Sequence, residues 1–326
     1  MVSFLSCSAP APQPNSRRVE VDVRPELRIS TLADTLAAKH IIANRALFHF
    51  YSWYYNYAPR IRPGRYRLPV GTGERRALKL LSGEEPALVL VTIPEGYTMN
   101  QVAAALEGRG ICRADSFLAA CADTDLLRES GVLAPNAEGY LFPETYEFLT
   151  NSPPGDVVRR LLRQFSSVFS ELLAPTPDPR PLAPHPSPPA PSPSLLTPPQ
   201  VVILASIVER EAKMPEEFPR IAGVFVNRLR RRIPLQSCAT VEYLLPERKG
   251  ILTVADTRIE SPYNTYLHAG LPPGPICNPG LRALEAAVNP ERNDYLFFVA
   301  RGDGTHIFSR TLAEHAAATH RALRDN

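Results

Sequence analysis

The sequence lacks several of the features that would assign a function directly. Its five cysteines include no CxxC pair, so neither a disulfide framework nor a zinc site is indicated. It also has no HExxH motif, no phosphate-binding loop and no GxSxG motif. These absences argue against a zinc protease, a nucleotide-dependent enzyme and a serine hydrolase. We expect neither a metal nor another cofactor.

Strong net charge and long apolar runs are also missing. The formal net charge of +3 is too small to predict nucleic-acid binding, which usually requires a clustered basic face. No stretch of about 18 apolar residues is present, so no transmembrane helix is expected in the sequence as given. Residues 1–18 lack the basic start of a signal peptide. We predict that they are disordered and, if the protein works outside the cytoplasm, that a membrane anchor is missing or truncated.

A weak internal repeat is present in the first half of the chain, at an offset of about 70 residues. The apolar positions of residues 21–47 recur in residues 91–117. Each copy alternates like a short strand, then has a turn, and then has apolar residues three and four apart, as in an amphipathic helix. The first half is therefore predicted to contain repeated strand and helix units. Between the copies, residues 74–82 predict a further helix that ends at Gly83.

A proline-rich segment divides the chain. Residues 174–199 hold 12 of the 35 prolines. Such a run cannot maintain helical or ladder hydrogen bonds, so we predict an extended linker. A plain spacer is favoured over a proline-rich ligand for another domain.

The segment after the linker predicts a mixture of helices and strands. Thr197 and Pro198 are typical of a helix start, and the residues after them are apolar on most sides, as in a buried helix. Further helices are predicted at residues 219–232, 279–287 and 311–323. A buried strand at residues 295–300 is predicted to pair with residues 306–308. The expected fold class is α+β.

Glu209 and Glu211 follow the apolar helical stretch from Val201 to Val208. A carboxyl group in such surroundings loses hydration, which raises its pKa and keeps it protonated near neutral pH, as a general acid requires. A spacing of two places these glutamates on different helix faces, so at most one can point with the buried face into a cleft. The alternative is that both lie on the solvent side and pair with Arg210 or Lys213.

Two polar loops carry groups that suit carbohydrate binding. Gln236, Ser237 and Thr240 lie in the first loop, and Tyr263 and Asn264 lie in the second. Amide and hydroxyl groups can hydrogen-bond to sugar hydroxyls and N-acetyl groups, and aromatic rings offer stacking surfaces. The same residue types are common in ordinary loops, where they tie the loop to the core. Both interpretations stay open on the residues alone.

From about residue 19 to its end, the chain resembles the MltG (YceG-like) family of endolytic murein transglycosylases. Eight blocks in the family's order carry the resemblance, and they are Ile93-Pro94-Glu95-Gly96-Tyr97-Thr98, residues 138–146, residues 204–211, Val226-Asn227-Arg228-Leu229, Leu235-Gln236-Ser237, residues 261–266, residues 270–276 and residues 295–300. One departure is Cys238-Ala239, where many members have Asp-Pro. An acidic role at that position is therefore not transferred to this chain.

The resemblance implies a domain arrangement and a catalytic residue. It implies a LysM-like peptidoglycan-binding region with repeated strand-helix units at residues 19–173, and a mixed α/β catalytic domain at residues 200–326, after the linker at 174–199. The family's essential acid and base maps onto Glu209 and not onto Glu211. The remaining site residues, expected to hold the sugars, are Gln236, Ser237, Thr240, Tyr263 and Asn264.

The activity implied by the resemblance is cleavage of glycan strands between N-acetylmuramic acid (MurNAc) and N-acetylglucosamine (GlcNAc) with formation of 1,6-anhydro-MurNAc ends, which would terminate growing strands. The expected partners are peptidoglycan strands and the penicillin-binding synthases, with no nucleic acid. The expected location is the inner membrane, with the catalytic domain on the periplasmic side. Three rivals are kept: a hydrolytic muramidase, a non-catalytic wall-binding scaffold, and a pyridoxal-phosphate lyase, for which Lys213 is an unconvincing Schiff-base lysine.

Overall fold

The computed structural model describes residues 17–174, 196–247 and 252–324, and the chain divides into two compact units. The first unit holds the described residues up to 93, with 102–118 and 145–157. The second holds 94–101, 119–144 and the described residues from 158 onwards, so three segments from before the proline-rich region, 94–101, 119–144 and 158–174, belong to the same unit as the chain after it. The disorder expected at residues 1–18 and the linker expected at 174–199 lie largely outside the described residues.

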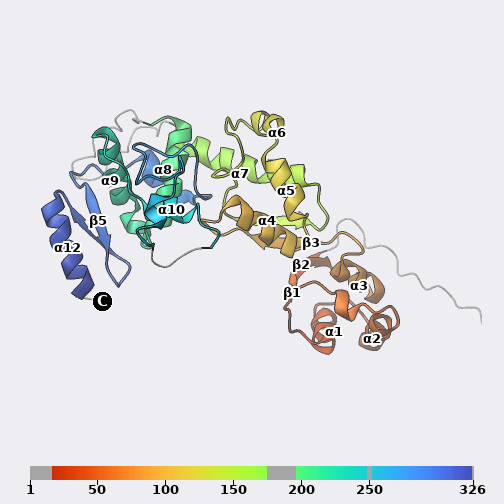
Figure 1. Cartoon of the computed structure of the whole chain (residues 1–326). Helices are drawn as coiled ribbons and strands as arrows, with labels where there is room; N and C mark the ends of the chain where they lie inside the picture. Colours follow the sequence, from red (N-terminus) through yellow and green to blue (C-terminus); the bar gives the residue numbers. More distant parts are fainter. Residues whose placement is uncertain (1–16, 175–195, 248–251, 325–326) are drawn as a thin grey trace, which may run out of the picture. The chain divides into compact units, whose positions relative to one another are not determined.

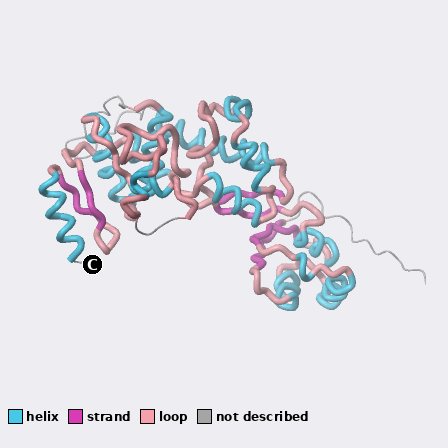
Figure 2. Tube along the Cα trace, viewed as in Figure 1, coloured by secondary structure: helices cyan, strands magenta, loops and turns pink. Residues whose placement is uncertain are grey.

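An antiparallel sheet of four strands is the centre of the first unit, drawn in magenta in Figure 2. The strands follow one another in the order β1 (Arg18–Val23), β2 (Gly64–Pro69), β3 (Leu88–Thr92) and β4 (Thr145–Leu149). The register places Val21, Tyr66, Val89 and Phe148 opposite one another in one row across the sheet, and all four are buried. Alternation along each strand therefore gives the sheet one apolar face that packs into the core.

The predicted repeat is confirmed as two strand-turn-helix units. The first is β1 with α1 (Ile29–Ala38), and the second is β3 with α4 (Met99–Gly108). In the second copy of the repeat, Thr98 and Gln101 cap the start of α4. The side chain of each accepts a hydrogen bond from the backbone N–H of the other. The helix predicted at residues 74–82 is α3 (Glu74–Ser82), which ends at Gly83 in a left-handed conformation. The first unit is completed by α2 (Arg45–Tyr54) and a short 3₁₀ turn, η1 (Ala58–Arg60). The LysM-like character of this region stays a prediction.

The second unit is built around α8 (Pro198–Glu211), whose residues 201–208 are buried on every side. Thr197 and Gln200 form a capping box at its start, as the Thr197-Pro198 pair predicted. Three helices pack against it, namely α9 (Phe218–Arg230), α10 (Cys238–Glu242) and α11 (Leu281–Val288) (Figure 1). A helix without a polar face is stable here because neighbours cover it on all sides.

A two-stranded hairpin of β5 (Phe297–Ala300) and β6 (His306–Ser309) pairs as predicted, and α12 (Leu312–Arg324) packs on it (Figure 1). The expectation of a buried strand at residues 295–300 holds only at Leu296, because the side chains of β5 are half-buried or exposed in a sheet of two strands. Short elements η2 (Pro215–Glu217), η3 (Asp256–Arg258) and α6 (Thr124–Glu129) complete this unit. Helices α4, α5 (Ala114–Cys121) and α7 (Pro154–Leu173) contribute residues to both units. Within the described ranges, none of the helices has the length and apolar character of a membrane span.

Candidate active site

Glu209 lies in the last turn of α8, directly after the fully buried stretch that ends at Val208. Its side chain is half-buried, and its Oε2 atom accepts a hydrogen bond from the backbone N–H of Gly280 at 2.9 Å. Burial raises the pKa of Glu209 to about 7, and the nearby charge of Glu95 acts in the same direction. The N–H of Gly280 and the charge of Arg210 act in the opposite direction. This carboxyl group can therefore hold a proton near neutral pH and still release it.

The turn Pro94-Glu95-Gly96 lies across the end of α8. Gly96 adopts a positive φ of 74°, and its N–H donates to the backbone oxygen of Asn278 at 2.9 Å. The guanidinium of Arg210 donates to the backbone oxygen of Gly96 at 3.3 Å. A Cβ atom at Gly96 would lie 3.6 Å from Cγ of Glu209, so this turn forms one wall around the carboxyl group.

Asn278 joins three segments of the second unit. It is fully buried, and its Oδ1 atom accepts from the N–H groups of Gly139 and Leu141, each at 2.9 Å. Its Nδ2 atom donates to the backbone oxygen of Tyr97 at 2.8 Å and to Glu138 at 3.2 Å. One amide side chain therefore holds together residues 94–101, residues 138–141 and the segment that leads to Gly280.

Ser206 ties that segment to α8. Its hydroxyl accepts from the N–H of Ile276 at 3.0 Å, and its backbone oxygen accepts from the thiol of Cys277 at 3.2 Å. Both cysteine and serine are fully buried. The serine has a structural task here, in agreement with the absence of a GxSxG motif.

Glu138 is a buried carboxyl group to which sequence reasoning assigned no role. It accepts from the N–H of Met99 at 2.9 and 3.0 Å through its two oxygens, and the hydroxyl of Tyr243 lies 3.5 Å away. Burial raises its pKa to about 7. The available signal was an acidic residue beside apolar neighbours, the same signal that drew attention to Glu209 and Glu211.

Glu211 leaves the helix in a different direction from Glu209, as their spacing predicted. It accepts a short hydrogen bond from the hydroxyl of Ser237, and burial raises its pKa. Arg210 pairs with Glu242 of α10 at 3.3 Å. The alternative that placed both glutamates on the solvent side does not describe this structure, because both carboxyl groups accept hydrogen bonds from inside the unit.

The first polar loop is fastened from within. Gln236 has a positive φ of 51°, and its Oε1 atom accepts from the guanidinium of Arg228 at 2.6 Å. Ser237 and Thr240 are buried, and the N–H of Ser237 donates to the hydroxyl of Thr265 at 3.0 Å. The hydroxyl of Thr240 donates to the backbone oxygen of Ser237 at 2.8 Å. The structure brings these predicted residues together, although Thr240 lies in α10 and not in the loop where it was expected, and among them Gln236 is the exposed one.

Tyr263 of the second polar loop pairs with Tyr243, whose hydroxyl lies near Glu138. Asn264 is fully buried and spans its own loop by donating to the backbone oxygens of Thr257 at 3.1 Å and Ile259 at 2.8 Å. Tyr263 is half-buried, and its ring lies 5.3 Å from that of Tyr243 between centroids. Of these two predicted residues, Tyr263 offers an accessible surface and Asn264 shapes the loop.

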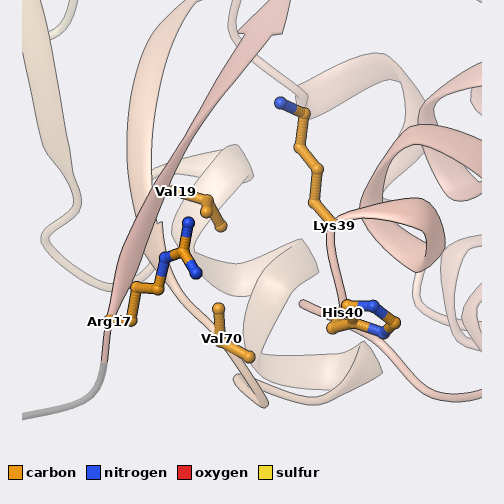
Figure 3. Close-up of a pocket in the computed structure, with 5 residues that line it drawn as sticks. All are labelled: Arg17, Val19, Lys39, His40 and Val70. Atoms are coloured by element: carbon orange, nitrogen blue, oxygen red, sulfur yellow. The ribbon is translucent and has the colours of Figure 1, made fainter.

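No cofactor site is evident in the parts of the chain that the structure describes. There, no group of three or more His, Cys, Asp or Glu side chains is placed to hold a metal ion. An open pocket of about 450 Å³ in the first unit is lined by Arg17, Val19, Lys39, His40 and Val70 (Figure 3). Its lining carries basic and apolar groups and no carboxyl group, so it does not supply the proton donor that Glu209 supplies.

Comparisons with known proteins agree with these features. The model of the YceG-like family matches residues 21–321. A protein of Bacillus subtilis (strain 168) named endolytic murein transglycosylase is 30% identical over 327 aligned positions, which cover 95% of this chain and 86% of that protein. A protein of Streptococcus pneumoniae serotype 2 with the same name is also 30% identical, over 88% of this chain, and the chain spans 55% of its length.

A solved structure shares the fold. The crystal structure of a YceG-like protein from Listeria monocytogenes superposes with a TM-score of 0.69 and 28% identity. The similarity covers 92% of this chain and 98% of the other. The fold of this chain therefore has a counterpart in an experimental structure of that name.

Proposed function

The chain belongs to the YceG-like family, and from this membership we propose that it is an endolytic lytic transglycosylase of peptidoglycan. The proposal is supported by the relatives named endolytic murein transglycosylase at 30% identity. The single structural observation that supports it most is the half-buried Glu209, held by Gly280 with a pKa of about 7. A general acid for glycosidic bond cleavage needs this combination of access and protonation.

In the proposed mechanism, Glu209 acts first as the acid and then as the base. Its proton passes to the oxygen that links MurNAc to GlcNAc, and the bond from C1 of MurNAc to that oxygen breaks. The carboxylate that remains takes the proton of the C6 hydroxyl of the same MurNAc, and O6 closes onto C1 as a 1,6-anhydro ring. Because the nucleophile belongs to the substrate, its effective concentration is high and no water has to be activated.

The finer parts of the proposal follow from this chemistry. Gln236 and Tyr263, which are accessible, contact the sugars, whereas Ser237, Thr240 and Asn264 keep the two loops in shape. The substrate lies outside the cytoplasmic membrane, so the enzyme acts on the periplasmic side of the inner membrane. Cleavage within nascent strands would end their elongation close to the penicillin-binding synthases that extend them.

Analysis of the reaction products tests this function. Purified peptidoglycan is digested with the protein, and the fragments are identified by mass spectrometry. The proposal expects 1,6-anhydro-MurNAc ends, which are lighter than hydrolytic ends by one water molecule. Reducing MurNAc ends would instead show a hydrolytic muramidase, and binding without any cleavage would show a wall-binding scaffold.

We expect the rate of cleavage to fall as the pH rises above about 7. Glu209 must be protonated to donate, and a raised pKa means that this form is complete well below pH 7 and is lost as the pH rises through about 7. The decline should approach tenfold for each further pH unit. Initial rates of glycan release, measured from about pH 5 to about pH 9, check this expectation.

Glu138 is the control for this pH dependence, because burial raises its pKa to about 7 as well. The variant Glu138→Gln should retain the alkaline decline if Glu209 causes it. A wild-type rate that stays constant to about pH 9 would contradict the assignment of Glu209 as the acid.

A further inference from the structure

A second carboxyl group lies against the same glycine that holds Glu209. If Gly280 carried a Cβ atom, this atom would lie 2.0 Å from Oε1 of Glu95 and 2.3 Å from its Cδ. The N–H of the same glycine donates to Glu209. The carboxyl groups of Glu95 and Glu209 therefore both meet Gly280, although they come from segments that are more than a hundred residues apart in the sequence.

The backbone of the Glu95 turn is held in place, so this approach has a structural cause. The next residue, Gly96, donates its N–H to the backbone oxygen of Asn278 and accepts from Arg210. Asn278 also donates its own N–H to the backbone oxygen of Tyr97 at 2.8 Å. These hydrogen bonds at Gly96 and Tyr97 hold the turn in place directly after Glu95, whose side chain lies against Gly280.

We propose that Glu95 is a positioning residue of the active site, whose negative charge helps Glu209 to keep the proton that it donates to the glycosidic oxygen. The inference rests on the proposed function, since it concerns the acid of that reaction. Glu95 itself is exposed and stays in contact with solvent, whereas Glu209 is half-buried. The two carboxyl groups thus differ in their exposure to solvent although they meet at the same glycine.

The other charged and titratable groups around Glu209 do not replace Glu95. Arg210, on the same helix, has the opposite effect on the pKa of Glu209, and its charge is shared with Glu242 of α10. Cys277, on the segment before α11, is a fully buried thiol whose pKa burial raises well above its usual value, so it is neutral. The charge of Glu95 acts in the direction of burial and adds to it.

The variant Glu95→Gln tests the inference through the pH profile of cleavage. Removal of the charge should move the alkaline decline to lower pH by about half a unit to one unit, because a like charge at this range favours the protonated form of its neighbour. The rate at about pH 8 should fall roughly three- to tenfold, and the rate at about pH 5.5 should stay near the wild-type value. The difference between variant and wild type should shrink in about 1 M salt, which screens an exposed charge.

Two further variants separate this electrostatic effect from a structural one. Gly280→Ala keeps the N–H that binds Glu209 and has a φ of −78°, which alanine accepts, but its methyl group occupies the place of the Glu95 carboxyl group. It should shift the profile in the same direction, and should add little to Glu95→Gln. Glu285→Gln removes an exposed charge from α11 that does not act on Glu209, and should leave the profile unchanged.

The possible results test the inference and the proposed function separately. An unshifted profile for Glu95→Gln, or a loss of activity that is equal at all pH values, would overturn the role of Glu95. The proposed function would stand in either case, provided that the wild type forms anhydro ends. Reducing ends or no cleavage by the wild type would remove the proposed function itself, before any variant is compared.

Discussion

Replacement of Glu209 by glutamine is expected to lower the rate of glycan cleavage by at least about a thousandfold, because one carboxyl group supplies both the acid and the base of the proposed reaction. Glutamine has nearly the same shape, and its side-chain oxygen can still accept from the N–H of Gly280. The fold should therefore be retained. Release of soluble glycan fragments, with thermal unfolding of the same preparation, checks both expectations.

Glu211→Gln is the matched control, two residues further along the same helix. This carboxyl group is also buried, but it accepts from Ser237, and glutamine can keep that hydrogen bond through its oxygen. We expect this variant to lose less than about tenfold in rate, since no proton of the reaction passes through it. If Glu209→Gln cleaves as fast as Glu211→Gln, the acid of the reaction lies elsewhere and the proposed mechanism is wrong.

The local pattern of the sequence predicted most elements of the fold, because their signals lie within a few neighbouring residues. The helix from Glu74 to Ser82 has the predicted ends, since Gly83 can take the left-handed conformation that ends a helix. The start of α8 was readable from Thr197 and Pro198. The burial of β5 was not, because it depends on how many strands join the sheet, which alternation alone does not tell.

The candidate site shows the same difference between signals from neighbouring residues and roles that depend on distant segments. The pattern singled out Glu209 together with Glu211, because their apolar neighbours are adjacent in sequence, and the family resemblance was needed to choose Glu209. Asn278 and Gly280 were missed, because their roles depend on segments that lie far away in the chain and meet only in the folded unit. Conversely, Asn264 carries an amide of the kind that binds sugars, but in the structure this amide hydrogen-bonds to the backbone of its own loop. The residue type determines which hydrogen bonds a side chain can make, whereas its burial and its partners in the fold determine which it does make.

Replacement of Asn278 by alanine should cost about 3 kcal/mol of stability and also slow catalysis, because several buried groups lose their partner at once. The N–H groups of Gly139 and Leu141 would have no acceptor from this side chain, and Glu138 would lose a donor. A buried donor left without a partner costs about 1–3 kcal/mol, so two of them make this loss larger than that of an ordinary hydrogen bond. Chemical denaturation measures the stability, and rates well below the lowered melting temperature measure the activity.

Asn136→Ala is the control for Asn278→Ala, because Asn136 is only half-buried and accepts a single hydrogen bond, from the N–H of Glu138. Its loss should cost about 1 kcal/mol or less. Equal stability of the two variants would contradict the role of Asn278 as the residue that joins three segments. Unchanged activity of Asn278→Ala would show that the position of Gly280, and with it the environment of Glu209, does not depend on this amide.

The variant Asn278→Asp separates the two halves of that amide. It keeps an acceptor for Gly139 and Leu141 but replaces the donor to Glu138 by a second carboxyl group. In the folded protein, burial raises the pKa of Glu138 to about 7. The folded state therefore binds this proton more tightly than the unfolded state does. The stability that this contributes is present below about pH 4 and is lost as the pH rises to about 7. A second carboxyl group beside it should steepen this loss. Unfolding of Asn278→Asp should therefore approach that of the wild type in acid and fall behind it towards neutral pH, whereas Asn278→Ala should differ from the wild type by a similar amount at both.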